Sequence, residues 1–293
     1  MRGDGMEYRI SGTTRLGGLL GSPVSHSLSP AMHNLSFQML GIDSVYLAFD
    51  VTNDRLADSV RVLKEFNTYG FNLTMPCKKA VMESLDEISK EARLIGAVNT
   101  VVNRDGKLTG YNTDGIGYVE SVRERGVVIE GSEITLLGAG GAACAAAVQM
   151  ALCGAKKIHI ANRRTPTFRA AQSLVDRINQ ETGCEADLTD LEDTNTLRAH
   201  IASSSLLTNA TSVGMAPDVE KTPIPDASML HEGLFVSDII YNPKTTRLMR
   251  DAQERGLDCC SGMYMLLYQG AAAFRLWTGQ EMPVESVREK YFG

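Results

Sequence analysis

Hydrophobic residues follow two periods along this chain, and their succession predicts its architecture. Short runs of apolar, strand-forming residues are followed by longer segments whose apolar residues recur every three or four positions. In the segment Asn53–Phe66, for example, Leu56, Val60 and Leu63 lie at helical spacing. This alternation of strands and helices is typical of a parallel sheet covered by helices, so we predict an α/β fold.

The periods also predict where each element lies. The predicted strands are Leu16–Leu20, Val45–Phe49, Gly70–Met75, Val98–Asn103, Lys107–Asn112, Ile134–Leu137, Lys157–Ala161, Glu185–Leu188, Leu206–Ala210, Leu234–Ile239 and Leu257–Cys260. The predicted helices are Ala31–Leu40, Asn53–Phe66, Lys79–Leu85, Ile88–Leu94, Ile116–Glu124, Ala143–Leu152, Thr167–Glu181, Asn195–Ser203, Thr245–Arg255, Tyr264–Thr278 and Val284–Tyr291. The last two helices have no later strand to cover. We therefore expect a first domain over residues 1–114, a second over 115–261, and C-terminal helices over 262–293 that pack back on the first domain.

A glycine turn follows the predicted strand that ends at Leu137. The motif has the G-x-G-x-x-G/A form and reads Gly138-Ala139-Gly140-Gly141-Ala142-Ala143. Glycine permits the tight turn and the close approach of a pyrophosphate, and the N-terminus of the following helix attracts negative charge. A plain structural turn would also use glycine, but the flanking strand and helix favour a dinucleotide-binding site.

The residues after the next predicted strand are expected to contact the adenosine ribose of such a cofactor. Asn162, Arg163 and Arg164 stand where these folds place an acid for NAD or a base for the 2′-phosphate of NADP. Arginine binds phosphate through two N–H groups and also stacks on adenine, so both cofactors stay open. The polar loop Asn209–Gly214, which contains Thr211, ends a later strand and is expected on the nicotinamide side.

Polar side chains also gather in loops of the first half. Ser27 and Ser29 precede a predicted helix, where they either cap the helix or line a pocket for an anion or a hydroxyl group. Thr74 and Lys78 follow the end of a predicted strand, where ligands of open α/β sheets bind, although a lysine there is often merely solvated.

A predicted hairpin adds further candidates. Asn99 lies at the start of its first arm, and Asn112, Thr113 and Asp114 end its second arm. Helix capping explains Asp114 on its own. It does not explain why three polar residues stand together there.

Composition excludes several classes of protein. The 293 residues are 43% hydrophobic and 22% charged, as in ordinary globular proteins. A net charge of −6 argues against nucleic acid or an anionic membrane as the main partner. No apolar run is long enough for a membrane span, and the N-terminal MRGDGMEYRI, which we expect to be a poorly ordered leader, lacks the apolar core of a signal peptide. These features predict a cytoplasmic protein without membrane partners.

The cysteines and histidines show no pattern typical of a metal site. Six cysteines and five histidines are scattered through the chain, and no two histidines form an H-x-x-x-H pair. The sequence therefore predicts neither a disulfide framework nor a metal centre.

Taken together, these motifs resemble the shikimate dehydrogenase family over essentially the whole chain after Leu16. The resemblance rests on six segments in the same order, Ser25–Pro30, Asn72–Lys78, Gly96–Thr100, Gly110–Gly115, Gly138–Ala142 and Gly262–Gln269. The order of six motifs is far more specific than any one of them. Tyr241-Asn242-Pro243 and Met265–Gly270 look especially like the quinate/shikimate dehydrogenase branch.

The resemblance implies an N-terminal α/β substrate domain and a Rossmann-type, doubly wound NAD(P)-binding domain. It also implies reversible reduction of 3-dehydroshikimate to shikimate in aromatic amino-acid biosynthesis, with quinate as a further substrate. Lys78 and Asp114 would form the catalytic pair. The implied substrate-binding residues are Ser27, Ser29 and Tyr241 for the carboxylate, and Thr74, Lys78, Asn99, Asp114 and Gln269 for the ring hydroxyls. The implied cofactor-binding residues are Gly138–Ala142, Asn162–Arg164, Thr211, Ile239 and Gly262.

One departure and two alternatives stay open. Thr165 stands where the quinate/shikimate branch carries an acid, so we expect use of both NADP and NAD. A dehydrogenase of the same architecture for a folate or an amino acid is one alternative, but Ser27, Ser29 and Tyr241 favour a small carboxylate substrate. A non-catalytic dinucleotide sensor is the other, and the presence of both Lys78 and Asp114 argues against it. The oligomeric state, a homodimer included, is not decided by the sequence.

Overall fold

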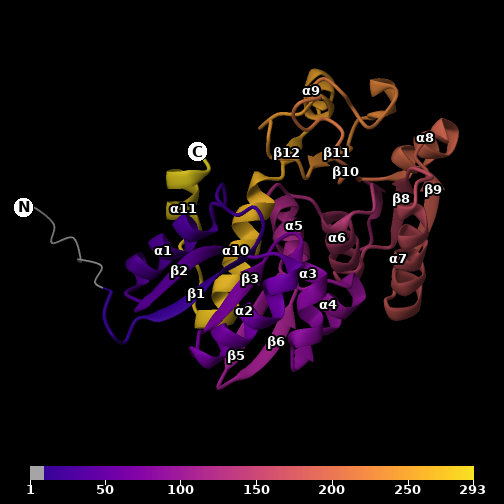
Figure 1. The fold of residues 1–293 in the computed structure, drawn as a ribbon. Coiled ribbons are helices and arrows are strands. Elements are labelled where there is room, and N and C mark those ends of the chain that lie inside the picture. The colour runs from indigo at the N-terminus through magenta and orange to yellow at the C-terminus, as the bar shows by residue number, and fades with distance from the viewer. Residues whose placement is uncertain (1–9) are drawn as a thin grey trace, which may run out of the picture. The chain divides into compact units, whose positions relative to one another are not determined.

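The computed structural model describes residues 10–293, so most of the expected N-terminal leader lies outside the described residues. The chain forms two compact units, one made of the residues up to Thr113 together with Gly270–Gly293, and the other of Asp114–Gln269 (Figure 1). We predicted boundaries after residues 114 and 261. The first boundary differs by one residue, since Asp114 belongs to the second unit. The second boundary differs because helix α10 (Met263–Thr278) is continuous, and its first part belongs to the second unit.

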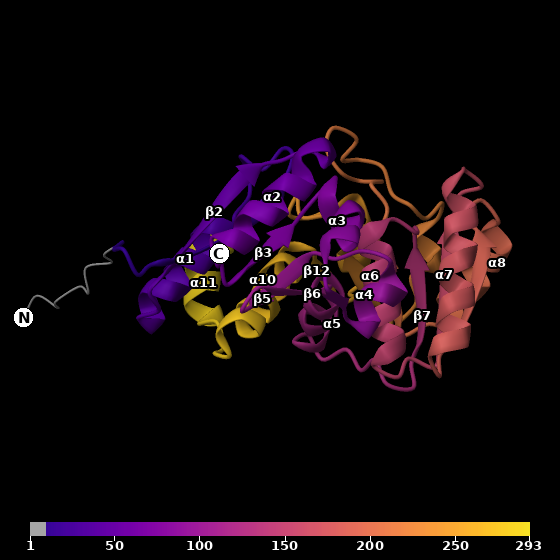
Figure 2. The same cartoon turned by 60° about the horizontal axis from the view of Figure 1, so that its bottom comes forward.

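The first unit is built on a six-stranded mixed sheet in the order β2-β1-β3-β5-β6-β4. Strands β1, β2 and β3 run parallel to one another, whereas β5 is antiparallel to both β3 and β6. Its elements are β1 (Arg15–Gly21), α1 (Ser29–Leu40), β2 (Ser44–Asp50), α2 (Asn53–Glu65), β3 (Gly70–Leu73), α3 (Cys77–Ala80), the 3₁₀ helix η1 (Val81–Ser84), β4 (Glu87–Ile88), α4 (Lys90–Ile95), β5 (Thr100–Arg104), β6 (Lys107–Tyr111) and α11 (Val284–Tyr291). Helix α11 lies beside α1 (Figure 2).

Two helix predictions in this unit were wrong. The segment predicted as the single helix Lys79–Leu85 is the short helix α3 followed by the 3₁₀ helix η1. The expected helix Ile88–Leu94 begins only at Lys90, because Glu87 and Ile88 pair with β6 as the short strand β4. The side chain of Ser89 then accepts a hydrogen bond from the backbone N–H of Ala92 and caps α4. A strand of two residues leaves no periodicity to detect.

The second part of α10 completes the core of the first unit. Phe274 is fully buried, and the indole Nε1 of Trp277 donates a 2.9 Å hydrogen bond to the carbonyl oxygen of Val101 in β5. Gly70 leaves room for this indole, since a Cβ there would collide with it. The second part of α10 is thus packed against the sheet that the N-terminal segment forms.

The second unit is a six-stranded, fully parallel sheet in the order β12-β11-β10-β7-β8-β9. Its elements are α5 (Asp114–Arg123), β7 (Glu133–Leu137), α6 (Gly141–Leu152), β8 (Lys157–Asn162), α7 (Thr167–Glu181), β9 (Glu185–Asp190), α8 (Thr194–Ser203), β10 (Leu206–Asn209), the 3₁₀ helix η2 (Ala227–Met229), β11 (Phe235–Asp238), α9 (Arg247–Glu254) and β12 (Cys259–Ser261). The strand order reverses between β7 and β10, as in doubly wound folds that bind dinucleotides. The predicted α/β fold class is confirmed.

Small side chains bring α6 close to its neighbours in this unit. Ala143, Ala145, Ala146 and Ala147 are fully buried. Helix α5 packs against α6 (Figure 1) at Gly115, where a Cβ would lie 2.5 Å from the carbonyl oxygen of Ala145. The Ala-rich segment is therefore a packing surface as well as a helix former.

Within the described residues, no helix has the length and hydropathy needed to cross a membrane.

Candidate active site

Predicted site residues of the first unit gather at one edge of its sheet. Strands β1 and β3 are parallel and both end there. Thr100, at the start of β5, pairs with Asn72 near the end of β3 and with Tyr111 at the end of β6. The loops after β1, β3 and β6 therefore meet at this edge. They carry Ser27 and Ser29, then Thr74 and Lys78, and finally Asn112 and Thr113.

A buried hydrogen-bond network stabilises this edge. The side-chain Oδ1 of Asn99 accepts hydrogen bonds from the backbone N–H of Thr113 at 2.7 Å and from the hydroxyl of Thr100 at 2.9 Å. Asn72 donates through Nδ2 to the carbonyl oxygen of Asn99 at 3.0 Å, and Tyr46 donates its hydroxyl to Asn72 Oδ1 at 2.7 Å. Fully satisfied buried networks of this kind hold a single geometry.

Lys78 is attached to the same network through its backbone. The carbonyl oxygen of Lys78 accepts a 2.8 Å hydrogen bond from the N–H of Val98, the residue next to Asn99. Cys77, just before it, is buried and its thiol donates to the carbonyl oxygen of Val51 at 3.3 Å. The Lys78 side chain is half-buried. Asp114 follows Thr113 directly and is the first residue of α5 in the second unit.

The serine loop is not a simple helix cap. Leu28 occupies the N-cap position of α1, and no side chain caps the helix there. Instead, Ser27 Oγ accepts a 3.2 Å hydrogen bond from the backbone N–H of Ser29, whose side chain is buried. The structure therefore shows no side-chain cap at the N-cap of α1, and the hydroxyl pocket stays a prediction. Two further predicted substrate residues belong to the second unit: Tyr241 is 52% exposed and Gln269 is 9% exposed.

In the second unit the glycine turn has the geometry that a pyrophosphate needs. Gly138 has φ +100°, and a Cβ there would lie 2.9 Å from the carbonyl oxygen of Ala210. A Cβ on Gly140 or Gly141 would meet no atom within 4 Å, so the space in front of α6 is open. Gly140 is the N-cap of α6 and offers no side-chain cap to its first N–H groups. The turn therefore fits a bound dinucleotide.

The ribose end combines two arginines with an acid that the sequence did not reveal. Arg163 and Arg164 are exposed, and Arg164 Nε lies 2.7 Å from Asp190 Oδ2 at the end of β9. Asp190 is the register partner of Asn162 across the β8–β9 pair. An acid thus stands beside the arginines in space, although it follows them by a whole helix in sequence.

A second buried network fixes the loops after β10 and β11. Asn209 Oδ1 accepts hydrogen bonds from the N–H and the hydroxyl of Thr211, and Asn209 Nδ2 donates to Asp238 Oδ2 at 3.0 Å. Asp238 also accepts from the N–H of Ile240 at 3.0 Å and from the Thr246 hydroxyl at 2.7 Å. Burial is the larger effect on this carboxyl group and raises its pKa.

Gly262 lies next to the second of these loops. A Cβ at this position would collide with the carbonyl group of Ile239. The two predicted cofactor residues Ile239 and Gly262 are therefore in direct contact through their backbones.

Comparison with known proteins places these features in one family. The model described as shikimate dehydrogenase substrate binding domain matches residues 19–101, and the one described as shikimate 5'-dehydrogenase C-terminal domain matches residues 262–290. A shikimate dehydrogenase (NADP(+)) from Listeria monocytogenes is 48% identical over 284 residues, which are 97% of this chain and 98% of the relative.

Solved structures agree with this match. The crystal structure of shikimate 5-dehydrogenase from Listeria monocytogenes in complex with shikimate and NAD superposes with a TM-score of 0.95 at 48% identity, over 96% of this chain and 98% of that one. Quinate dehydrogenase from Corynebacterium glutamicum in complex with NAD has a TM-score of 0.85 at 32% identity, over 95% and 99% of the two chains.

Proposed function

Because this chain belongs to the shikimate dehydrogenase family, we propose that it catalyses the reversible NAD(P)-dependent reduction of 3-dehydroshikimate to shikimate. The observation that carries the proposal is the network around Asn99. Val98 and Asn99 hold the backbone of Lys78 and of Thr113, the residue before Asp114, by two hydrogen bonds of 2.8 and 2.7 Å. The two proposed proton-transfer residues, Lys78 and Asp114, are thus connected to the same segment, Val98-Asn99, the first directly and the second through Thr113.

Lys78 is the proposed proton donor. A bound nicotinamide would supply the hydride for reduction of the ring ketone. As negative charge develops on the ketone oxygen, the Lys78 ammonium stabilises it and donates a proton from Nζ. In the reverse direction the amine of Lys78 accepts the proton of the ring hydroxyl. Asp114 would orient the ammonium group and keep it charged.

The other polar residues would position the substrate. Ser27, Ser29 and Tyr241 would bind its carboxylate through hydroxyl groups, and Thr74, Asn99 and Gln269 would bind its ring hydroxyls. Asn99 and Ser29 are buried and Thr74 is half-buried, so these groups lose little side-chain freedom when a ligand arrives. Positioning of this kind is a large part of the catalytic effect in enzymes.

The cofactor residues support use of both NADP and NAD. Gly138–Ala142 would hold the pyrophosphate, and Thr211, Ile239 and Gly262 would flank the nicotinamide half. Arg163 and Arg164 would bind the 2′-phosphate of NADP, whereas Asp190 offers a carboxylate to the free ribose hydroxyls of NAD. The relatives include examples of both cofactors, since one is named for NADP(+) and a solved structure contains NAD.

Steady-state kinetics of Lys78→Met, with Lys79→Met as the matched control, test this function. Lys79 is exposed and adjacent, so its loss changes the net charge equally without the proposed role. We expect Lys78→Met to lower kcat by roughly 10²- to 10⁴-fold while the affinity for NADP stays the same. Unchanged turnover in Lys78→Met, or an equal loss in Lys79→Met, would refute the assignment.

Quinate oxidation is a second candidate activity. The similarity to a quinate dehydrogenase at 32% identity favours testing it. Initial rates with shikimate and quinate, each with NAD and NADP, give the substrate and cofactor preferences together. Light scattering on the same sample distinguishes a monomer from a homodimer.

We also propose a cytoplasmic location. All six cysteines are free, which suits a reducing compartment. Fractionation of cells that express the protein, followed by immunodetection, tests this.

A further inference from the structure

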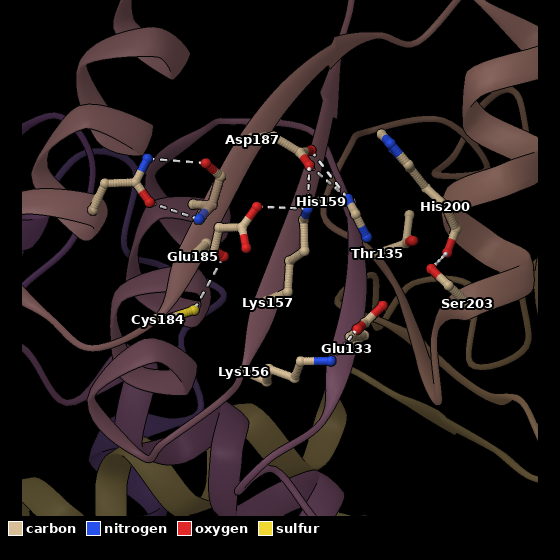
Figure 3. Close-up of polar contacts among 12 residues, drawn as sticks. Glu133, Thr135, Lys156, Lys157, His159, Cys184, Glu185, Asp187, His200 and Ser203 are labelled. Carbon is tan, nitrogen blue, oxygen red and sulfur yellow. Dashed lines mark hydrogen bonds and ion pairs between the residues drawn. The ribbon is translucent and has the colours of Figure 1, made fainter.

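Three metal-ligating side chains meet in the second unit, outside the proposed active site. They are His159 of β8, Asp187 of β9 and His200 of α8 (Figure 3). One nitrogen or oxygen atom from each lies within 4.8 Å of those from the other two. We propose that these three residues bind a divalent transition-metal ion of the zinc type.

Burial and unsatisfied hydrogen-bonding capacity support the site. The His159 side chain is 6% exposed, and its Nδ1 lies 2.9 and 3.1 Å from the two Asp187 oxygens. His159 Nε2 and His200 Nδ1 are both buried without a hydrogen-bond partner among the described residues. Buried polar atoms are normally paired, so the two unpaired imidazole nitrogens indicate a missing partner. Asp187 faces the other nitrogen of His159, Nδ1, which must therefore be deprotonated to bind the ion together with the carboxylate.

The present ring arrangement shows what binding requires. The two imidazole rings are stacked, with centroids 3.9 Å apart and planes inclined by 15°. Stacked rings direct their nitrogen lone pairs side by side, so the half-buried His200 ring must turn for the lone pairs to converge. The backbone of α8 stays in place, because His231 Nε2 lies 3.1 Å from the carbonyl oxygens of both Ile201 and Ser204.

The charges around the cluster are compatible with a cation. Lys157 Nζ lies 3.5 Å from Asp187 Oδ2 and opposes metal binding, but its shorter ion pair, 2.7 Å, is with Glu185. When a cation binds Asp187, Lys157 therefore keeps a partner. Asp193 adds negative charge near His200. The charge of Glu133 near His159 is balanced by Lys156, whose Nζ lies 2.8 Å from the Glu133 carboxylate.

The donor set determines the class of metal. Two imidazole nitrogens and one carboxylate oxygen suit Zn²⁺ and related ions, whereas Mg²⁺ and Ca²⁺ prefer oxygen ligands alone. Three protein ligands leave the fourth tetrahedral position to water. The ion would link β8, β9 and α8 and stabilise the second unit by mass action.

Metal titration of the full chain tests the proposal. After treatment with a chelator, we expect the protein to bind one equivalent of Zn²⁺ by calorimetry and to show a Zn²⁺-dependent rise in Tm. Co²⁺ should give the visible bands of a tetrahedral site without the thiolate-to-metal bands that cysteine ligands produce. His200→Gln and Asp187→Asn should each weaken Zn²⁺ binding at least about 100-fold, since even outer-sphere partners are worth 10- to 100-fold.

Two controls make the result decisive. His26→Gln removes an exposed histidine of the first unit and should bind Zn²⁺ like the wild type. Lys157→Gln removes the competing ammonium and should bind more tightly. Absence of binding to the wild type, equal affinity in His200→Gln or Asp187→Asn, or thiolate bands with Co²⁺ would overturn the proposal. Circular dichroism shows whether each variant is folded, and the two ligand variants act as independent tests.

Discussion

His33 should make the first unit sensitive to acid. The side chain is fully buried, and neither ring nitrogen has a hydrogen-bond partner among the described residues. Its ring centroid lies 4.5 Å from that of Tyr46, 5.1 Å from that of Trp277 and 6.2 Å from that of Phe274. Burial without a compensating charge lowers the pKa of His33 from 6.5 to about 3.

The sign and size of the effect follow from proton linkage. Below pH 6.5 the unfolded chain binds a proton at His33, while the folded chain does not until about pH 3. The free energy of unfolding therefore falls as the pH falls through this window. At about 1.4 kcal/mol per pKa unit, the loss is about 2 kcal/mol at about pH 5 and approaches about 5 kcal/mol at about pH 3.

Urea unfolding of the wild type and of His33→Leu measures this loss. Trp277 is the only tryptophan of the chain and contacts His33, so its fluorescence reports the unfolding of the unit concerned. Other titrating groups cancel in the difference between the two proteins. We expect that difference to change by about 2 kcal/mol between about pH 7.5 and pH 5, in favour of His33→Leu at the lower pH. Parallel pH profiles would show that His33 is not kept neutral in the folded protein.

Three further substitutions test other parts of the structure. Gly138→Ala forces a side chain into φ +100° and against the carbonyl oxygen of Ala210. We expect weaker NADP binding, measured by calorimetry, and a free energy of unfolding lower by about 1–3 kcal/mol, measured by thermal melts. Arg164→Ala should raise KM for NADP more than KM for NAD, and an equal rise for both would contradict a role at the 2′-phosphate. Thr100→Val removes the hydroxyl that hydrogen-bonds to both Asn72 and Asn99. We expect the free energy of unfolding in urea to fall by about 1–3 kcal/mol. An unchanged urea midpoint would mean that the network adds nothing to stability.

Local patterns predicted most elements of the second unit. Helix α7 has the predicted bounds because Ala171, Leu174, Val175 and Ile178 form a single buried stripe. The glycine turn was equally clear, since strand, turn and helix are contiguous in sequence. Where a signal is contained in one short segment, periodicity and turn chemistry identify it.

The features that the sequence did not reveal all join residues of separate elements. Asp190 reaches Arg164 only because β8 and β9 are adjacent, and Tyr46 and Thr100 read as ordinary strand residues until β2, β3 and β5 are placed in register. The His159 cluster joins two strands and a helix in the same way. Residues brought together from separate elements have no characteristic spacing, so counting along the chain could not find them.

The contribution of α10 to the first unit has a consequence for biosynthesis. Phe274 and Trp277 belong to the core around His33 and Val101, yet they follow the whole second unit in the chain. The second unit, Asp114–Gln269, is continuous and can complete its core before they emerge. Domains usually fold in the order of synthesis, N-terminal first. In this chain we expect the reverse order, because the first unit cannot complete its core until the second part of α10 has been synthesised.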